Sequence, residues 1–131
     1  MKLVYVAGRY TAKDGRTVAQ NIEEARRVGR DVAEVPGLFP VVPHQLGAGM
    51  EDIGDYDYWV QGTLELLRSC HAVCTVPGWE ESTGARGEVD EAKRLGMAVV
   101  HMDWDDPSEA RERLSRLVDV VVIEGGVRRA G

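Results

Sequence analysis

A glutamate stands where a helix of a globular protein usually carries an apolar residue. Residues 77–92 leave an apolar run, turn through a Ser-Thr-Gly sequence and continue in a helical pattern. At about 100° per residue, Glu88 lies on the helix face that should contact a sheet. The apolar residues of that face are Val89, Ala92 and Leu95. Because burying an unpartnered carboxylate costs several kcal/mol, Glu88 is a candidate catalytic or binding residue. The alternative is a first-turn glutamate that only complements the helix dipole.

Two further loops are predicted to converge near this turn. The loop after the apolar run at residues 3–7 contains Gly8, Arg9 and Tyr10, and the loop after the run at residues 38–42 contains His44. Loops at the carboxyl ends of parallel strands bind ligands in open α/β sheets. His44 is therefore either a ligand-binding residue or a structural histidine with satisfied hydrogen bonds.

Strand and helix patterns alternate along the chain. Apolar runs predict strands at residues 3–7, 38–42, 72–76, 98–100 and 118–123. A Thr-Val-Ala-Gln capping box starts the first helix, and Asp-Pro starts the last one. We therefore expect one α/β domain over residues 1–124, a flavodoxin- or Rossmann-like three-layer sandwich of about five mostly parallel strands with helices on both faces. Residues 125–131 are expected to form a flexible tail.

Residues 46–58 lack a helical period and are rich in Gly, Asp and Tyr. This composition predicts a surface loop or lid, in which Asp55 and Asp57 are the candidate acids. From about Trp59 the pattern becomes helical.

Composition limits the classes of partner. The net charge of −6 over 131 residues argues against a nucleic-acid polymer, because phosphate neutralisation needs a basic patch. No apolar run approaches the roughly 18 residues of a membrane span. Cys70 and Cys74 follow no signal peptide, so we expect reduced thiols and a cytoplasmic location. His71 is their one neighbour of metal-binding type, so neither zinc nor another metal is expected.

Four stretches resemble the nucleoside 2-deoxyribosyltransferase-like superfamily, in particular a branch of small bacterial and phage domains related to deoxynucleoside 5′-monophosphate N-glycosidases. The stretches are Val4-Tyr5-Val6-Ala7-Gly8, Pro43-His44, residues 64–70 and, most specifically, the Ser-x-Gly-x-x-x-Glu turn within residues 77–88. The resemblance covers roughly residues 3–100.

Members of this superfamily cleave or transfer the N-glycosidic bond of deoxynucleosides and nucleoside 5′-monophosphates. The resemblance implies that Glu88 is the nucleophile and that Tyr5 and His44 contact the sugar or the base. It also implies that Ser82 and Gly84 belong to a phosphate-binding turn, and it implies no cofactor.

Further contacts to a phosphate would come from the same region. Thr83, Arg9 and Arg86 would add charge-assisted hydrogen bonds to those of the backbone at the helix N-terminus. We expect a homodimer or larger, because the Val60 and Leu64 surface is apolar and related proteins complete their pockets across subunits.

The sequence departs from the superfamily at two positions. Arg9 stands where the related branch usually has proline, and Thr63 stands where the superfamily has an aspartate that holds the sugar hydroxyl and supports proton transfer. Either Asp55 or Asp57 supplies the second carboxylate, or the protein is a nucleotide-binding module without turnover. Tyr10 and Thr63 remain candidate substrate contacts.

Overall fold

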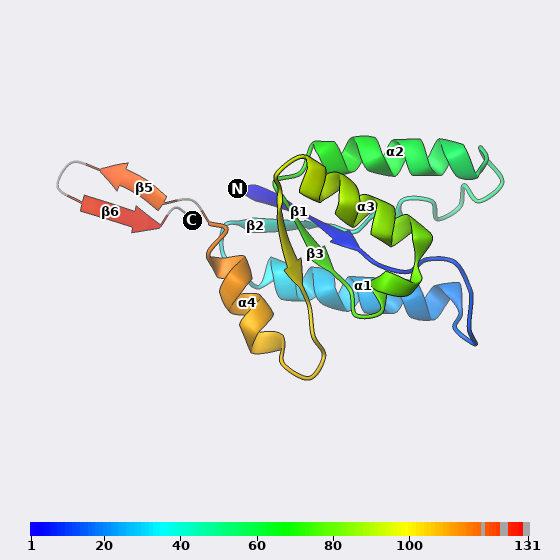
Figure 1. Ribbon diagram of the computed structural model, residues 1–131, viewed down its shortest axis with the longest axis horizontal. Helices are drawn as coiled ribbons and strands as arrows, with labels where there is room; N and C mark the ends of the chain where they lie inside the picture. The colour runs from blue at the N-terminus through cyan, green and yellow to red at the C-terminus, as the bar shows by residue number, and fades with distance from the viewer. Residues whose placement is uncertain (119, 124–125, 130–131) are drawn as a thin grey trace.

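Four parallel strands form the main sheet of the protein, in the order β2-β1-β3-β4. The structure is a computed structural model and describes residues 1–118, 120–123 and 126–129. The strands are β1 (Lys2–Ala7), β2 (Leu38–Val41), β3 (Ala72–Thr75) and β4 (Ala98–His101) (Figure 1). The strand order reverses between β1 and β3, so their carboxyl ends form the crevice where such sheets bind ligands.

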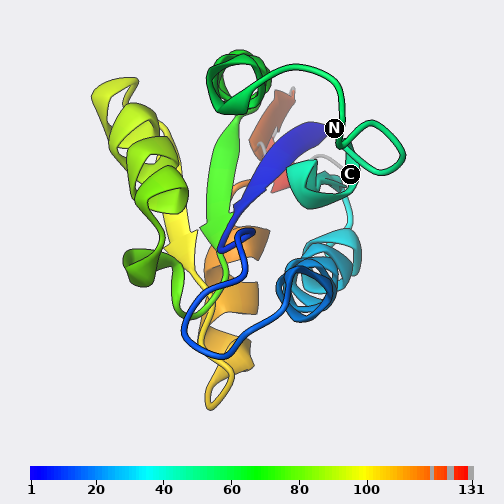
Figure 2. The ribbon, with the colours of Figure 1, turned by 90° about the vertical axis from the view of Figure 1, so that its right-hand side faces the viewer.

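Helices cover both faces of this sheet, as predicted. They are α1 (Val18–Ala33), α2 (Tyr56–Arg68), α3 (Thr83–Arg94) and α4 (Pro107–Ser115), with the short 3₁₀ helices η1 (Pro43–Gln45) and η2 (Trp79–Glu81). Figure 2 shows α2 and α3 on one face and α1 and α4 on the other. The α/β class is therefore confirmed as a three-layer, doubly wound arrangement.

Alternate residues of β1 belong to two different cores. Val4 and Val6 pack in a cluster with residues of α1 and α4, whereas Tyr5 and Ala7 pack in a cluster with residues of α2 and α3. This alternation follows from the two-residue period of a strand. Both clusters are closed to solvent at β1, where Tyr5 has 0% of its surface exposed.

Local signals place most helix starts where the sequence predicts them. The Thr17 side chain accepts a hydrogen bond from the Gln20 N–H, and the Gln20 side chain accepts one from the Thr17 N–H, which completes the capping box. Asp106 precedes Pro107 at the start of α4. Leu95 was expected on the inner face of α3, but it is the C-cap residue and is 42% exposed, because the helix ends at Arg94.

The helix α2 begins earlier than predicted. Asp55 is its N-cap residue, and the Asp55 carboxylate accepts a hydrogen bond of 2.9 Å from the Tyr58 N–H. Residues 56–58 are therefore helical and not part of a loop. A single side-chain cap fixed the boundary here, although residues 46–58 carry no helical period.

The predicted fifth strand does not extend the main sheet. β5 (Val120–Ile123) pairs antiparallel with β6 (Gly126–Arg129) in a separate two-stranded sheet. The run of valines favours an extended backbone, but it does not select a partner, and pairing with a segment a few residues away closes a shorter loop. Of the tail expected at residues 125–131, residues 125, 130 and 131 lie outside the described part of the chain.

Among the described residues, no helix combines the length and the apolar character that crossing a membrane requires.

Candidate active site

A tyrosine and a glutamate meet between the sheet and α3. Tyr5 lies on the central strand β1, and its hydroxyl donates a hydrogen bond to Oε2 of Glu88 on α3. The predicted inward orientation of Glu88 is therefore confirmed. Glu88 follows the first turn of α3, which contains no acidic residue, so it is not a glutamate that caps the dipole.

Burial changes the proton affinity of both groups. Loss of water raises the pKa of Glu88 to about 7, and the hydrogen bond from Tyr5 opposes this rise. Burial also raises the pKa of the Tyr5 phenol, and the neighbouring Glu88 charge raises it further. A helix N-terminus favours the ionised form of a carboxyl group, but burial dominates at Glu88, so both protonation states are populated at neutral pH.

Thr63, which belongs to α2, lies beside the Tyr5–Glu88 pair. Burial raises the pKa of Tyr5, and the Thr63 side chain lies close enough to the phenol to oppose part of this rise. The Thr63 Oγ1 also donates to the backbone carbonyls of Trp59 and Val60, at 3.0 and 3.2 Å. The residue that replaces the superfamily aspartate therefore lies next to the Tyr5–Glu88 pair.

A groove of about 610 Å³ runs along α2 and reaches Thr63. Its lining is mainly apolar and aromatic, from Leu46, Tyr58, Trp59, Gln61, Gly62, Thr63 and Leu66. The Trp59 indole is fixed by a hydrogen bond of 2.8 Å to the Ile53 carbonyl. Thr63 lines this groove, whereas Tyr5 and Glu88 do not.

His44 lies at the carboxyl edge of the sheet, against the end of β1. Its Nε2 is 3.2 Å from the Gly8 carbonyl, and its ring is 6.3 Å from that of Tyr10, measured between centroids. Burial lowers the pKa of His44, although hydrogen bonds to the carbonyls of Gly8 and Arg9 oppose this. A neutral ring that donates from Nε2 leaves Nδ1 as an acceptor, and this buried atom has no hydrogen-bond partner among the described residues.

Arg9 crosses the edge of the sheet and is held by carboxylates. It pairs with Glu81 at 3.0 Å and with Glu24 at 3.7 Å. Its guanidinium lies over Gly78, where an added Cβ would be 2.6 Å from the Arg9 Cζ, and the positive φ of 91° also favours glycine. The positive charge of Arg9, which the sequence suggested for binding a phosphate, is therefore already paired with protein carboxylates.

The turn before α3 forms the helix N-terminus that the sequence predicts. Ser82 is the N-cap residue, and its Oγ accepts a hydrogen bond of 3.2 Å from the Ala85 N–H. Thr83 and Gly84 are exposed in the first turn. Arg86 is exposed and its guanidinium donates to the Thr83 Oγ1 at 3.3 Å. These residues lie together at the end of the helix that carries Glu88.

The two candidate lid acids have other surroundings. The Asp55 carboxylate is used as the cap of α2, and Asp57 is exposed in the first turn of that helix, where its charge complements the dipole. In the part of the chain that the structure describes, no group of three or more histidine, cysteine or acidic side chains is arranged to hold a metal ion.

Two further residues lie near the site. The Cys70 thiol, at the end of α2, raises the pKa of Tyr5, so it lies close to the phenol. Tyr56 lies at the start of α2 and faces Gly84 of α3. If the helix had been predicted to begin at residue 56, the pattern would have placed Tyr56 on the same side of α2 as Thr63, because the two are seven residues apart.

The fold and the site together define the class of protein. It is a doubly wound α/β domain with a carboxylate–phenol pair between two helices and the sheet. The chain belongs to the family described as "Domain of unknown function (DUF4406)", whose model matches residues 2–101. The match includes Tyr5, Thr63 and Glu88. No curated protein matches the chain.

Proposed function

We propose that the protein hydrolyses or transfers the N-glycosidic bond of a nucleoside 5′-monophosphate or a nucleoside, with Glu88 as the nucleophile. The observation that carries this proposal is the hydrogen bond from the Tyr5 hydroxyl to the half-buried Glu88 carboxylate. A carboxylate that is buried, oriented by a neighbour and shifted in pKa is typical of a catalytic group. The resemblance to the nucleoside 2-deoxyribosyltransferase-like superfamily supports the assignment of the bond.

The chemistry assigns separate roles to the residues of the site. The ionised Glu88 attacks the anomeric carbon, the C–N bond breaks, and the base leaves with the electron pair and takes up a proton. Water or a second base then attacks the glycosyl ester and releases Glu88. Tyr5 holds one carboxylate oxygen, so the other oxygen is available for attack.

The start of α3 is the proposed place of a 5′-phosphate. Backbone N–H groups of Thr83 and Gly84 have no intrahelical partner, and Ser82 and Thr83 offer hydroxyls. Arg86 would add charge, and Arg9 would do so only after release from Glu81 and Glu24. A monophosphate should therefore bind more tightly than its nucleoside, by roughly 1–3 kcal/mol. Equal affinities in calorimetry would favour a nucleoside as the ligand.

A second candidate function is a nucleotide-binding module without turnover. Thr63 favours it, because a hydroxyl beside Tyr5 cannot protonate a leaving base at neutral pH as a carboxylic acid would. The carboxylate of Asp55 is used as a helix cap, which leaves Asp57 as the nearer candidate for that task.

We also propose a cytoplasmic homodimer or larger assembly. The apolar surface that supports association differs from the predicted one, because Leu64 packs against the core cluster of Tyr5. The exposed apolar side chains nearby are Leu46, Ile53, Tyr56 and Tyr58. Light scattering that gives the 14.4 kDa monomer at micromolar concentration would contradict this assembly.

Release of free base tests the proposed function directly. A panel of nucleosides and their 5′-monophosphates is incubated with the wild type and with Thr63→Asp, and the products are separated by chromatography. Base release by the wild type supports the enzyme. Release by Thr63→Asp alone supports the binding module, and binding of no panel member by either protein would contradict both functions.

A further inference from the structure

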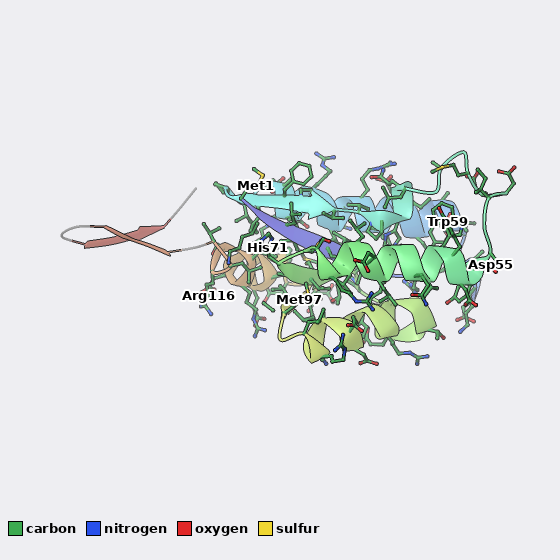
Figure 3. The ribbon with its side chains drawn as sticks, turned by 90° about the horizontal axis from the view of Figure 1, so that it is seen from above. Met1, Asp55, Trp59, His71, Met97 and Arg116 are labelled. Carbon is green, nitrogen blue, oxygen red and sulfur yellow. The ribbon has the colours of Figure 1, made fainter. Side chains whose placement is uncertain are left out.

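The site lies between two helices that run in the same direction. α2 and α3 pack against the same face of the sheet, and both begin at its carboxyl edge (Figures 1 and 2). In Figure 3, Asp55 marks the start of α2, while His71 and Met97 lie toward the opposite edge of the sheet. A ligand that approaches Glu88 from the carboxyl edge therefore passes the first turns of both helices.

Residues of the two helices form two levels along this approach. The inner level is Thr63 on α2 and Glu88 on α3, which are joined through Tyr5. The outer level is Tyr56 and Gly84, seven residues before Thr63 and four residues before Glu88. At 1.5 Å per residue, the outer level lies about 6 to 10 Å nearer the carboxyl edge.

The Tyr56 side chain spans the gap at the outer level. Its hydroxyl is 4.0 Å from the position that a Cβ on Gly84 would occupy, and Gly84 itself has no side chain to fill the space. Tyr56 nevertheless remains 66% exposed, so packing does not explain its orientation. The Asp55 cap fixes the helical start from which Tyr56 projects.

We propose that Tyr56 is a specificity-determining residue of the Tyr5–Glu88 site, which covers the approach between α2 and α3 and contacts the part of a ligand that projects beyond Glu88. This inference rests on the proposed function for the identity of the ligand. A pentose ring with its 5′-substituent extends over the distance between the two levels, so the phenol would meet the sugar hydroxymethyl or the phosphate attached to it. The ring provides an apolar contact and the hydroxyl provides a hydrogen bond.

Two substitutions at Tyr56 distinguish the contribution of the ring to ligand binding from that of the hydroxyl. Calorimetry with a deoxynucleoside 5′-monophosphate measures Kd for the wild type, Tyr56→Phe and Tyr56→Ala. Loss of one hydrogen bond should raise Kd roughly 2- to 10-fold in Tyr56→Phe, and loss of the ring should raise it further in Tyr56→Ala. Tyr58→Ala is the control, since Tyr58 is also exposed but lines the groove along α2, to which neither Tyr5 nor Glu88 contributes. Its Kd should stay within twofold of the wild type.

A second measurement needs no ligand. The Glu88 carboxyl is titrated by ¹³C NMR in the same four proteins. If Tyr56 covers the approach, Tyr56→Ala admits water and lowers the Glu88 pKa from its value of about 7, while Tyr58→Ala leaves it unchanged. If the wild type binds no nucleotide or nucleoside, the proposed function fails and this titration alone decides the role of Tyr56. An unchanged Glu88 titration together with an unchanged Kd, or equal effects of Tyr56→Ala and Tyr58→Ala, would overturn the inference.

Discussion

Tyr5 and Glu88 are 83 residues apart in the sequence, and the phenol of the first donates a hydrogen bond to a carboxylate oxygen of the second. The contact joins the central strand of the sheet to the helix that follows the neighbouring strand. It therefore forms only when β1, β3 and α3 are assembled. The Tyr5–Glu88 contact is thus a property of the assembled fold and not of any single segment.

Removal of the carboxylate charge should abolish catalysis without preventing the binding of a nucleotide. Glu88→Gln keeps the shape of the side chain, so turnover should fall by several orders of magnitude while a nucleotide still binds. Single-turnover assays with calorimetry in parallel separate the two effects. A variant with unchanged turnover would remove Glu88 from the role of nucleophile.

The pH dependence of activity should follow the ionisation of Glu88. Because the nucleophile is the ionised form and its pKa is about 7, the rate should rise with pH through the neutral range. In Tyr5→Phe the hydrogen bond that lowers this pKa is lost, so the acid limb should move to higher pH. A limb that stays in place in Tyr5→Phe would show that another group controls it.

The same ionisation should make folding stability depend on pH. The folded pKa of Glu88 lies above its ordinary value of 4.5, so between these pH values the folded protein holds a proton that the unfolded chain has released. Its contribution to stability is therefore present below about pH 4.5 and is lost as pH rises through 7. At pH 8, Glu88→Gln should be more stable than the wild type by on the order of 2–3 kcal/mol, and at pH 4 the two should be similar. Urea unfolding at both pH values measures the difference.

Asp55 offers a test that separates a helix cap from a catalytic acid. Asparagine is as good an N-cap residue as aspartate, so Asp55→Asn should retain both stability and activity. Asp55→Ala should lose about 1 kcal/mol in urea unfolding. If Asp55→Asn instead loses activity at unchanged stability, the carboxylate has a chemical role.

Glycine positions in and before α3 should respond in opposite directions. No heavy atom lies within 4 Å of a Cβ added at Gly87, so Gly87→Ala should stabilise the helix by about 0.5–1 kcal/mol. At Gly78, by contrast, an added Cβ meets the Arg9 guanidinium and φ is 91°, so Gly78→Ala should lower the melting temperature. Equal shifts in thermal unfolding would contradict this difference.

Periodicity and caps predicted most of the fold, because the two signals are local. The inward face of Glu88 and the capping box at Thr17 both follow from residues within a few positions of one another. The partner of β5 could not be predicted, since a run of valines specifies an extended backbone and not its neighbour. The start of α2 was missed because the Asp55 cap is a single side chain within an irregular segment.

The candidate site was predicted less completely than the fold, for reasons of distance and of charge. The topology of parallel strands correctly brings His44 to Gly8, whereas the contact between Tyr5 and Glu88 was not predicted from it. The sequence could not show that Glu24 and Glu81 neutralise Arg9, because ion pairs depend on side-chain positions across three separate elements. The direction in which the pKa of Glu88 shifts could not be predicted for a related reason, since the effect of burial depends on packing that the sequence does not show.

The division of β1 between two cores has a consequence for how the sequence can diverge. Val4 and Val6 face a core that contains none of the proposed reactive groups, whereas Tyr5 and Ala7 face the one from which Glu88 is approached. Repacking around α1 and α4 can therefore adjust thermal tolerance while the chemistry is left untouched. On the α2 and α3 side, a residue that improves packing also alters the surroundings of the carboxylate. Lineages that adapt to new temperatures should accumulate replacements on the first side, and lineages that acquire new substrates should accumulate them on the second.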